Sequence, residues 1–429
     1  MDIQAPLGTE DILPEQALLW QRVEQTARSL FARYGYGEIR TPVFEDTRLF
    51  VRSIGEATDI VEKEMYSFGS GEESLTLRPE ATAPVVRAYL EHNLHKSKSF
   101  QKLYYIGPMF RHERPQAGRK RQFHQIGVEA IGATDPVLDA EVIALACHFF
   151  DELGLSGYRV RLNAIGTPES RGSYRDLIRA MLNAQAEALC GDCRRRIDRN
   201  VFRVLDCKVE SCIAIARKLP RILDHLPEAE RTHFARVCKA LHSAHVSFVE
   251  DAYLVRGFDY YTATVFEITH GALGAQDALC GGGRYDNLIA DLGGPPLGAV
   301  GFALGCERLL MAIQAAGPAP EPAPLDVYIV TIGDAARQAA FGHLTALRRA
   351  GLSADTDYEG RSPKAQMRTA NKLRARFTLL LGEDELARGV LKVKNMATGE
   401  ECALPDIPAV IAKVREREGA GAGGVDINP

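Results

Sequence analysis

Two alternating segments joined by one strongly basic loop constrain the fold of this chain more than any other feature. Residues 102–110 alternate as a β-strand does, and further along Gln125, Gly127 and Glu129 share one face of a second strand. The stretch over residues 110–129 carries five cations and two imidazoles. We therefore predict a β-hairpin with a polar floor, a gap at Gly127, and a basic mouth suited to phosphate groups and nucleic acid.

The basic loop has an alternative interpretation as a solvated hairpin tip, because runs of charge more often lie on solvated surface. The Glu and Gln side chains beneath the loop favour a binding site instead. The whole chain carries a formal net charge of -4, which argues against a nucleic-acid binder held by bulk electrostatics. Any contact with nucleic acid must therefore come from local patches such as this loop.

A proline-rich string marks the clearest domain boundary. The chain has 429 residues, more than one ordinary core accommodates, and GPAPEPAP occupies residues 317–324. We predict a first domain over residues 1–320. Strand and helix patterns alternate after the string, which predicts a small α/β domain over residues 325–417. The glycine-rich end, residues 418–429, is predicted to be a flexible tail.

The first domain is predicted to contain a helical insertion over residues 168–248, where the pattern is rich in Arg and Ala with little strand character. Around the insertion we predict helices over residues 15–35 and 135–154, strands over residues 39–44, 158–166 and 253–268, and a strand-to-helix passage over residues 298–313. Pro42 interrupts the first of these strands, which indicates a sheet edge or an interface.

Four of the nine cysteines cluster in the helical insertion. Cys190 and Cys193 are followed, after thirteen residues, by Cys207 and Cys212, a spacing that fits a structural zinc site with four thiolate ligands. Free thiols on a helical insertion are the alternative. The odd total, scattered over a long chain without an export signal, indicates reduced thiols rather than a disulfide framework.

No segment predicts export or membrane insertion. The N-terminus carries acids and prolines where a signal peptide needs a basic start and an apolar core, and no apolar run reaches membrane-spanning length. We therefore expect a cytoplasmic protein with no membrane partner.

Six motifs spread over nearly the whole chain carry a family resemblance. A proline-containing segment ends near Pro42, LRPEATAP begins at Leu77, FRHERPQ and RQFHQ flank the basic loop, and GFALGCERL follows residue 300. Two longer signatures are LVRGFDYYTATVFEI from Leu254 and CGGGRYDNLI from Cys280. Together these motifs resemble the class II aminoacyl-tRNA synthetases. The two signatures resemble those of the histidyl-tRNA synthetase family.

The resemblance implies an α+β class II catalytic domain, with a six-stranded antiparallel sheet and flanking helices, that contains the helical insertion. It further implies a C-terminal α/β anticodon-binding domain and a homodimer formed through the first motif. One position departs from the family pattern. Ala81 stands where the family usually has glycine, and its methyl group is expected near the amino-acid pocket.

The implied activity joins L-histidine to ATP, releases pyrophosphate, and transfers histidine from the adenylate to the 3′ end of tRNA(His). The attacking carboxylate is already an anion, so the step requires fixed cations and no general base. Arginine suits this work because it is permanently charged and binds phosphate oxygens through two N–H groups. By resemblance the catalytic arginines are Arg111, Arg256 and Arg308, and Mg²⁺ accompanies ATP as part of the substrate.

The resemblance also assigns binding residues. Histidine is expected at Glu80, Thr82 and Gln125 through its ammonium group, and at Glu129 and Tyr261 through its imidazole, with Arg111, Arg256 and Tyr260 completing the pocket. ATP is expected at Arg111, Glu113, Phe123 and Arg308. The tRNA acceptor end is expected at Arg114, Gln116, Arg119 and Arg121. A basic segment with Arg368, Lys372, Arg374 and Arg376 suits either an anticodon stem or a solvated helix face.

Two of these residues have ordinary structural alternatives. The alternative for Arg256 is an arginine at the end of a strand that pairs with Asp259. The alternative for Glu129 is a salt bridge on the surface of the sheet. Side chains alternate along a regular strand, so Arg256 and Tyr261 cannot face the same side of one. Both line a pocket only if the chain turns near Gly257, which glycine permits.

Two other functions compete with the synthetase interpretation. The first is the non-enzymatic regulatory paralogue of histidyl-tRNA synthetase that partners a short ATP phosphoribosyltransferase. That paralogue commonly loses the catalytic arginines and the C-terminal domain, which this chain retains. The second is a dinucleotide oxidoreductase, suggested by the glycine-rich segments. No G-x-G-x-x-G opens a helix after a strand, which leaves this alternative without support.

Overall fold

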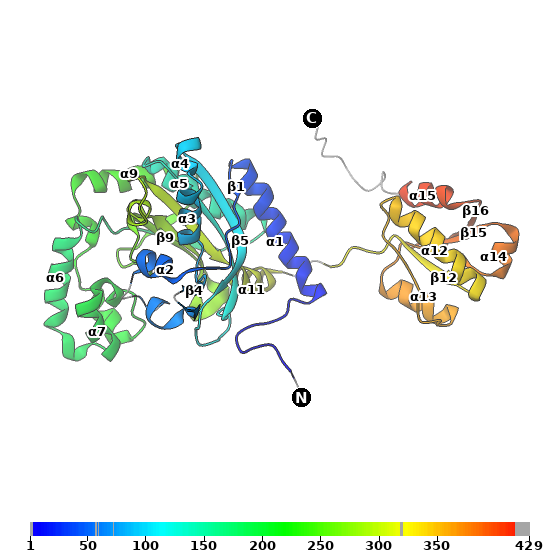
Figure 1. Cartoon of the computed structure of the whole chain (residues 1–429), viewed down its shortest axis with the longest axis horizontal. Coiled ribbons are helices and arrows are strands. Elements are labelled where there is room, and N and C mark those ends of the chain that lie inside the picture. The colour runs from blue at the N-terminus through cyan, green and yellow to red at the C-terminus, as the bar shows by residue number, and fades with distance from the viewer. Residues whose placement is uncertain (1–2, 56–57, 59, 72, 318–320, 417–429) are drawn as a thin grey trace. The chain divides into compact units, whose positions relative to one another are not determined.

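The structure, a computed structural model, describes residues 3–55, 58, 60–71, 73–317 and 321–416. The chain divides into two compact units, Met1–Pro320 and Glu321–Pro429, which are coloured along the chain in Figure 1. The tail predicted over residues 418–429 lies outside the described residues. In the described part of the chain, no helix combines the length and the apolar character needed to cross a membrane.

An eight-stranded sheet forms the centre of the first unit. In spatial order its strands are β1 (Gly37–Glu38), β5 (Gln101–Phe110), β6 (Gln122–Ile131), β11 (Ala299–Gly305), β10 (Ala278–Arg284), β9 (Thr262–His270), β7 (Tyr158–Ala164) and β8 (Phe248–Glu250). The six inner strands are antiparallel throughout, and each edge strand adds one parallel pairing. The expected six-stranded antiparallel sheet is confirmed. This sheet is not the parallel sheet of a dinucleotide-binding fold.

The predicted hairpin is formed by β5 and β6. Its two strands pair residue for residue, from Gln101 opposite Ile131 to Phe110 opposite Gln122. The alternation has the expected consequence, because Ile126 and Val128 are fully buried in the core. The polar positions between them therefore face the opposite side of the sheet.

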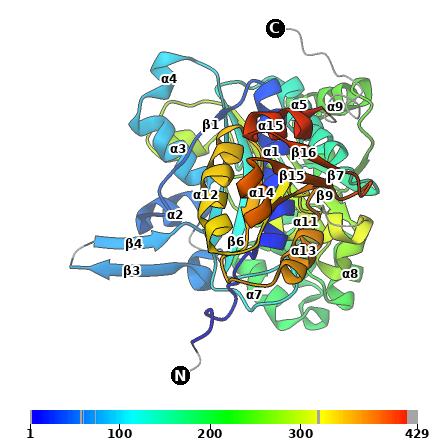
Figure 2. The same cartoon turned by 90° about the vertical axis from the view of Figure 1, so that its right-hand side faces the viewer.

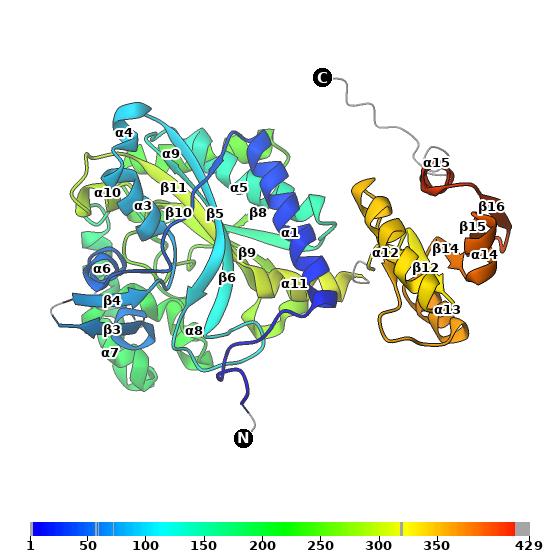
Figure 3. The same cartoon turned by 45° about the vertical axis from the view of Figure 1, so that its right-hand side comes forward.

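Three long helices pack with this sheet: α1 (Pro14–Arg33), α5 (Pro136–Glu152) and α11 (Cys306–Ala316). Figure 3 shows α1 running beside β5. Helix α5 begins where the Asp135 carboxylate accepts a hydrogen bond from Val137 N at 2.8 Å. Buried phenylalanines of α1 and α5 then meet Phe302 of β11 in one core.

Two predicted strands are partly wrong. Of residues 39–44 only Phe44 belongs to a strand, β2 (Phe44–Asp46), because Pro42 has no N–H and its carbonyl accepts from the Arg78 guanidinium instead of a neighbouring strand. Residues 253–261 form a loop instead of a strand. At its start, the Asp251 carboxylate accepts a hydrogen bond from Tyr253 N at 3.0 Å, which favours a turn. Strand β9 begins only at Thr262.

A small three-stranded sheet projects from the unit. Its strands are β2, β4 (Glu73–Leu77) and β3 (Tyr66–Ser70). Figure 2 shows β4 and β3 extending away from the main body. Helices α3 (Thr82–Glu91) and α4 (Leu94–Ser97) connect this sheet to the main sheet. Helix α2 (Thr47–Ile54) follows β2, and α10 (Leu288–Asp291), which follows β10, contacts α2 and α3. Phe44 and Phe68 lie on the small sheet with ring centroids 6.3 Å apart, and both are about half exposed.

The insertion is helical, as predicted. It comprises α6 (Gly172–Asn183), α7 (Gly191–Arg199), the 3-10 turn η3 (Val201–Val204), α8 (Glu210–Ala216) and α9 (Glu228–Ser243). Helix α9 packs on α5, where His233 Nε2 lies 2.9 Å from the buried carboxylate of Asp139. The same carboxylate accepts from Arg284 Nε at 3.0 Å, and Arg284 is 1% exposed. The insertion therefore shares a core with the sheet.

The second unit is a small α/β domain, as predicted. Its sheet has the order β13 (Ala354–Thr356), β12 (Val327–Thr331), β14 (Phe377–Leu381), β15 (Leu391–Asn395) and β16 (Glu401–Leu404), with parallel pairing among the first three strands. Its helices are α12 (Asp334–Arg349), α13 (Pro363–Lys372), α14 (Glu383–Arg388) and α15 (Ile407–Arg415).

Candidate active site

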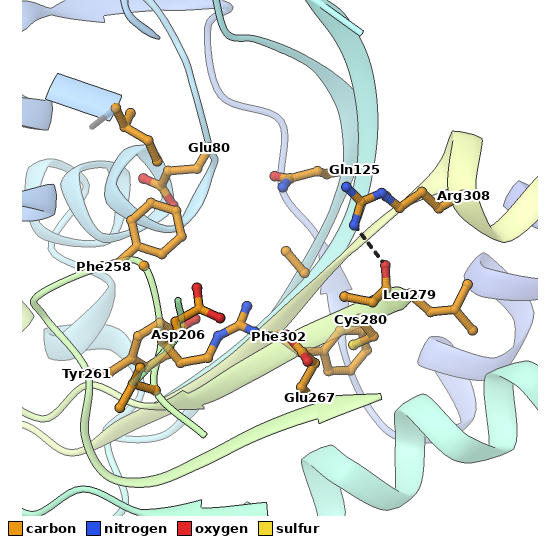
Figure 4. A pocket seen from close by; sticks show the side chains of 18 of the residues that line it. Glu80, Gln125, Asp206, Phe258, Tyr261, Glu267, Leu279, Cys280, Phe302 and Arg308 are labelled. Carbon is orange, nitrogen blue, oxygen red and sulfur yellow. Dashed lines mark hydrogen bonds and ion pairs between the residues drawn. The ribbon is translucent and has the colours of Figure 1, made fainter. Parts of the chain in front are cut away.

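A cavity of about 620 Å³ opens above the polar face of the main sheet. All of the residues expected to bind histidine or ATP line it: Glu80, Thr82, Arg111, Glu113, Phe123, Gln125, Glu129, Arg256, Tyr260, Tyr261 and Arg308. Figure 4 shows Glu80, Phe258 and Tyr261 toward one end of this cavity and Arg308 at the other. Residues from five separate segments of the chain thus converge on one site.

Glu129 on β6 forms the most deeply buried acid of the polar floor. Its side chain is 1% exposed and accepts hydrogen bonds from the hydroxyls of Thr82, at 2.7 Å, and Tyr285. Burial raises the pKa of Glu129 to about 8, although these two hydroxyls act in the opposite direction. A surface salt bridge, the structural alternative for Glu129, is therefore wrong.

Glycines on the neighbouring strands make room for the charged side chains. A Cβ atom at Gly301, which pairs with Glu129, would lie 2.0 Å from Glu129 Oε2. A Cβ atom at Gly281 of β10 would lie 2.0 Å from the Arg256 guanidinium. Glycine within a strand often marks such a close approach, and these two positions explain the glycine-rich signatures physically.

Glu80 caps the N-terminus of helix α3. Its carboxylate accepts hydrogen bonds from Thr82 N at 2.7 Å and Ala83 N at 2.9 Å, and burial raises its pKa. Ala81 between them has φ -119°, so the substitution of the family's glycine causes no backbone strain. Each carboxylate oxygen of Glu80 keeps a second lone pair for a ligand.

Arg256 lies in the 253–261 loop and pairs with Glu267 of β9, Nη1 to Oε2, at 3.0 Å. Glu267 also accepts from Arg161 Nη1 at 3.0 Å. The predicted alternative, a pair with Asp259, is wrong, and the predicted turn near Gly257 is confirmed. Within the described chain, the buried Nε of Arg256 has no hydrogen-bond partner, and neither has Gln125 Oε1. Partnerless buried polar atoms at a cavity wall indicate a polar ligand.

Arg111 and Phe123 lie together at the centre of the cavity. The Arg111 guanidinium lies 5.2 Å from the centroid of the Phe123 ring and 5.8 Å from that of Phe258. Arg111 Nε donates to the Pro79 carbonyl at 2.9 Å. Glu113 lies 3.8 Å from Arg111. One face of Phe123 is therefore covered by a cation.

Arg308 at the start of α11 is fixed by two backbone carbonyls. Its Nε donates to Gly118 O and its Nη1 to Ala278 O, each at 3.0 Å. Burial lowers its pKa, and the nearby Arg119 charge acts in the same direction. Because carbonyls orient the side chain without neutralising it, the positive charge of Arg308 is available to an anion.

The four residues expected at the tRNA acceptor end do not form one cluster. Arg119 lines the cavity and pairs with Glu113 at 3.1 Å. Arg121 stabilises the loop between β5 and β6, since its Nε donates to Glu113 O at 3.3 Å. Arg114 and Gln116 are exposed and do not line the cavity. In the second unit, Arg374 pairs with Glu321 and Arg376 with Asp326, so these two members of the basic segment hold the start of their own domain.

Sequence reasoning missed several lining residues. The insertion contributes Arg196, Arg203, Leu205, Asp206 and Lys208 to the cavity wall. Glu267 and Tyr285 were missed although both lie in the two long signatures. Glu267 is a lone acid in an otherwise apolar strand pattern, which is a signal that could have identified it. The insertion residues carry no such signal, because only the tertiary fold brings them to the cavity.

The four clustered cysteines meet in space. Their sulfur atoms all lie within 4.8 Å of one another, with Cys193, Cys207 and Cys212 buried. Cys190 and Cys207 sulfurs are 3.9 Å apart. Backbone N–H groups point at three of the sulfurs: Cys190 N at Cys212, Cys193 N at Cys190, and Val209 N at Cys207, over 3.2 to 3.4 Å.

This site is chemically suited to transfer of a phosphoryl-linked group. Arg111, Arg256 and Arg308 surround the cavity with fixed positive charge, and the polar floor offers acceptors for a cationic or imidazole-bearing ligand. The residues expected to bind histidine and the three arginines expected to bind phosphate line the same cavity.

The glycine at position 281 provides a test of this geometry. We expect Gly281→Ala to displace the Arg256 guanidinium. The rate of the reaction catalysed at this site should then fall by about 10-fold or more, since small misplacements of a reacting group are costly. Thermal stability should change little because the displaced atoms end a flexible side chain. Gly271→Ala is the matched control, since nothing lies within 4 Å of its Cβ position. Unchanged activity in Gly281→Ala would contradict the tight packing of Arg256.

Comparisons with known proteins agree with this geometry. The family model described as histidyl-tRNA synthetase matches residues 8–309, and the anticodon binding domain model matches residues 326–417. A histidine–tRNA ligase of Halothermothrix orenii is 51% identical over 94% of this chain and 97% of its own length. A histidine–tRNA ligase of Moorella thermoacetica is 49% identical over 97% of this chain and 99% of its own length. The crystal structure of apo S. aureus histidyl-tRNA synthetase superposes with a TM-score of 0.80 at 39% identity, over 97% of this chain and 99% of that one.

Proposed function

The chain belongs to the histidyl-tRNA synthetase family, and from this premise we propose how its cavity carries out the family's reaction. The reaction activates L-histidine with ATP and joins it to tRNA. One observation carries the assignment of this cavity to both substrates. Buried polar atoms of Gln125 and Arg256 lack partners in the described chain and lie in the same cavity as Arg308, whose charge is fixed by carbonyls.

Three arginines stabilise the phosphoryl transfer. A carboxylate oxygen of histidine attacks the α-phosphorus of ATP, the bond to the β-phosphate oxygen breaks, and pyrophosphate leaves with that electron pair. Arg111 and Arg256 bind the α-phosphate from opposite sides, and Arg308 meets the γ-phosphate. No proton moves in this step, so the arginines act by position and charge. Mg²⁺ enters with ATP as part of the substrate.

Histidine binds at the floor of the cavity. Glu80, Thr82 and Gln125 accept hydrogen bonds from its ammonium group, and Glu129 and Tyr261 contact its imidazole. The hydrogen bond from Thr82 to Glu129 supports this arrangement, because it couples the two halves of the subsite. Tyr260 completes the pocket from the 253–261 loop.

The adenine lies beside Phe123. Arg111 covers one face of that ring, so the base stacks on the face that remains. The carboxylate of Glu113 accepts a hydrogen bond from the adenine amine. Glu113 also pairs with Arg119 at 3.1 Å. This ion pair holds the basic loop next to the expected position of the nucleotide.

The tRNA contacts both units. Arg119 of the hairpin loop, with Arg121, Arg114 and Gln116, is proposed at the acceptor end, and residues 325–417 at the anticodon. Arg368, Lys372 and Arg374 are the exposed members of the basic segment. Arg374 pairs with Glu321, so Arg368 and Lys372 are the members that suit phosphate contacts. These assignments keep the catalytic domain at residues 1–320 with its insertion at residues 168–248. The protein is proposed to act in the cytoplasm.

The regulatory paralogue is disfavoured as an alternative. All three arginines line the cavity, and the relatives near 50% identity that match almost the whole chain are histidine–tRNA ligases. A regulatory protein would not require the arginine constellation of phosphoryl transfer.

The cysteine cluster is proposed to hold one structural zinc ion. A tetrahedral site with zinc–sulfur bonds of about 2.3 Å requires sulfur atoms about 3.8 Å apart, close to the 3.9 Å between Cys190 and Cys207. Hydrogen bonds from backbone N–H groups to sulfur favour the thiolate form, which is the form that binds metal. Three of the four thiols are buried, and none belongs to a disulfide.

A homodimer is proposed through the small sheet. Phe44 and Phe68 expose 46% and 49% of their surfaces on the two strands that flank β4, and Val43 beside Phe44 exposes 40%. An exposed apolar cluster of this kind marks a surface that is covered in the working assembly. The position of Pro42 next to this cluster is consistent with an interface.

We expect Phe68→Lys to convert the dimer into a monomer, because the introduced charge would have to be buried unpaired at the interface. Light scattering coupled to gel filtration measures the mass. Tyr358→Lys, at a site in the second unit that is 69% exposed, is the control. Wild-type protein that runs as a monomer at micromolar concentration would contradict the proposal.

The transfer step is tested by charging tRNA. The protein is incubated with ATP, labelled histidine and total tRNA, and the acid-stable label on tRNA is measured. Histidine should accumulate on tRNA(His) only. Pyrophosphate exchange without charging would contradict the proposed tRNA contacts and leave the activation step standing.

A further inference from the structure

The cysteine cluster lies at the base of a segment that reaches the cavity. We call residues 194–206, between the second and third cysteines, the knuckle loop; it contains most of α7 and all of η3. We propose that the metal held by Cys190, Cys193, Cys207 and Cys212 positions the 253–261 loop through the knuckle loop, so that histidine activation depends on this metal. The inference rests on the proposed zinc site and extends it from a structural role to a role in the reaction.

A first contact joins the two loops directly. Asn200 Nδ2 donates to Asp259 Oδ1 at 2.8 Å. Asp259 in turn donates its backbone N–H to Ile54 O at 3.3 Å. Asn200 directly follows the last residue of α7, so its position depends on how that helix ends.

A second contact lies at the glycine where the 253–261 loop turns. The Arg203 guanidinium lies 3.0 Å from the Cβ position of Gly257, the residue after Arg256. A Cβ atom at this position would press on the Arg203 guanidinium. The knuckle loop thus packs against the backbone next to the arginine that is proposed to bind the α-phosphate.

A third contact runs through the body of the insertion. Phe202 of η3 stacks on Tyr174 with ring centroids 6.2 Å apart, and the Arg171 guanidinium lies 5.5 Å from the Phe202 centroid. Arg171 Nη1 then donates to Tyr261 O at 3.3 Å. The knuckle loop therefore reaches the 253–261 loop at residues 257, 259 and 261, on the segment that also carries Arg256.

The knuckle loop also forms part of the cavity wall. Arg196, Arg203, Leu205 and Asp206 line the cavity, and Asp206 directly precedes the ligand Cys207. A change in the spacing of the sulfur atoms would move these residues with it. Metal binding and the shape of the cavity are therefore linked through the backbone of one short segment.

The knuckle loop has little regular secondary structure, and its Ile197, Val201 and Val204 are buried in the core of the first unit. Helix α7 has 9 residues and η3 has 4. Isolated helices below about 12 residues are marginal in water. A metal that joins both ends of the segment adds a constraint to this packing, since the free energy of metal binding is then available to fold it.

The test combines metal analysis with pyrophosphate exchange on the full chain. We would compare wild type, Cys193→Ser and Asn200→Ala, with Cys402→Ser as a control because Cys402 is exposed in the other unit. Zinc per chain is measured after purification without chelator, and histidine-dependent exchange gives kcat and KM. Circular dichroism confirms that each variant is folded. Asn200→Ala keeps all four thiolates and removes only a contact to the 253–261 loop.

The expected result is about one equivalent of zinc in wild type, Cys402→Ser and Asn200→Ala. Cys193→Ser should lose the zinc, and its kcat/KM for histidine should fall about 100-fold, as expected for misplaced reacting groups. Asn200→Ala should keep zinc while its kcat falls. Folded, zinc-free Cys193→Ser with normal exchange would overturn the proposed coupling. Less than about a tenth of an equivalent in active wild type would overturn the metal site itself and, with it, the coupling. Zinc-loaded wild type without exchange would instead contradict the proposed function.

Discussion

Arg256→Ala is expected to reduce histidine-dependent pyrophosphate exchange by about 10² to 10³-fold, mainly through kcat. This is the loss that removal of one fixed donor from a developing negative charge produces. The guanidinium is held by Glu267 at 3.0 Å and by its close fit over Gly281, so the charge is positioned before substrate binds. Initial rates at several histidine and ATP concentrations separate kcat from KM.

Arg256→Lys is the informative companion to the alanine variant. Lysine keeps a positive charge but lacks the planar pair of N–H donors, and we expect it to recover only part of the lost rate. Arg348→Ala, in the second unit, serves as the arginine control. If Arg256→Ala retained full kcat with a raised KM for histidine, Arg256 would be a binding residue only and the proposed stabilisation of the α-phosphate would be wrong.

Glu129→Gln is expected to lower kcat/KM for histidine about 100-fold, the scale of a hydrogen bond to a charged group in a buried site. Glutamine nearly matches the shape of the carboxyl group but cannot share a proton with the imidazole. The wild-type carboxyl has a pKa of about 8, and free imidazole one of about 6.5. We expect the bound complex to hold one proton between the two groups.

This proton count fixes the pH dependence. Between about pH 6.5 and 8 the free partners together already carry one proton, so histidine affinity should be highest there. Above the pKa of Glu129 both partners are deprotonated and must take up a proton, so KM should rise with pH. Below about 6.5 both are protonated and one must be released, so KM should rise again. Glu129→Gln should lose the upper limb of this profile. A wild-type KM that falls as pH rises through 8 would contradict the shared proton.

The hairpin and most of its site were predictable because local rules and tertiary structure agree there. Alternation over residues 102–110 and 125–129 placed Gln125 and Glu129 on one face, and both line the cavity. The parity argument on Arg256 and Tyr261 required a turn near Gly257, and the loop over residues 253–261 has it. Such arguments work where one face of a strand is buried, because a shift of one residue would exchange its two faces.

The failures have an equally physical origin. The strand expected over residues 39–44 is lost because the Arg78 guanidinium binds carbonyls that a neighbouring strand would otherwise use, a contact between distant segments. The cavity residues of the knuckle loop were missed for the same reason, since the position of Arg203 beside Gly257 depends on the whole insertion. Sequence patterns predict which face of a helix or strand is buried. They do not predict which distant loops come into contact.

The most direct test of the central claim is pyrophosphate exchange into ATP with each of the twenty amino acids in turn. The cavity described here, with Glu129 buried beside Tyr285 and Thr82, predicts exchange with histidine and no exchange above background with the other nineteen. Absence of exchange in folded protein, or exchange driven by a different amino acid, would contradict the assignment of this cavity to histidine.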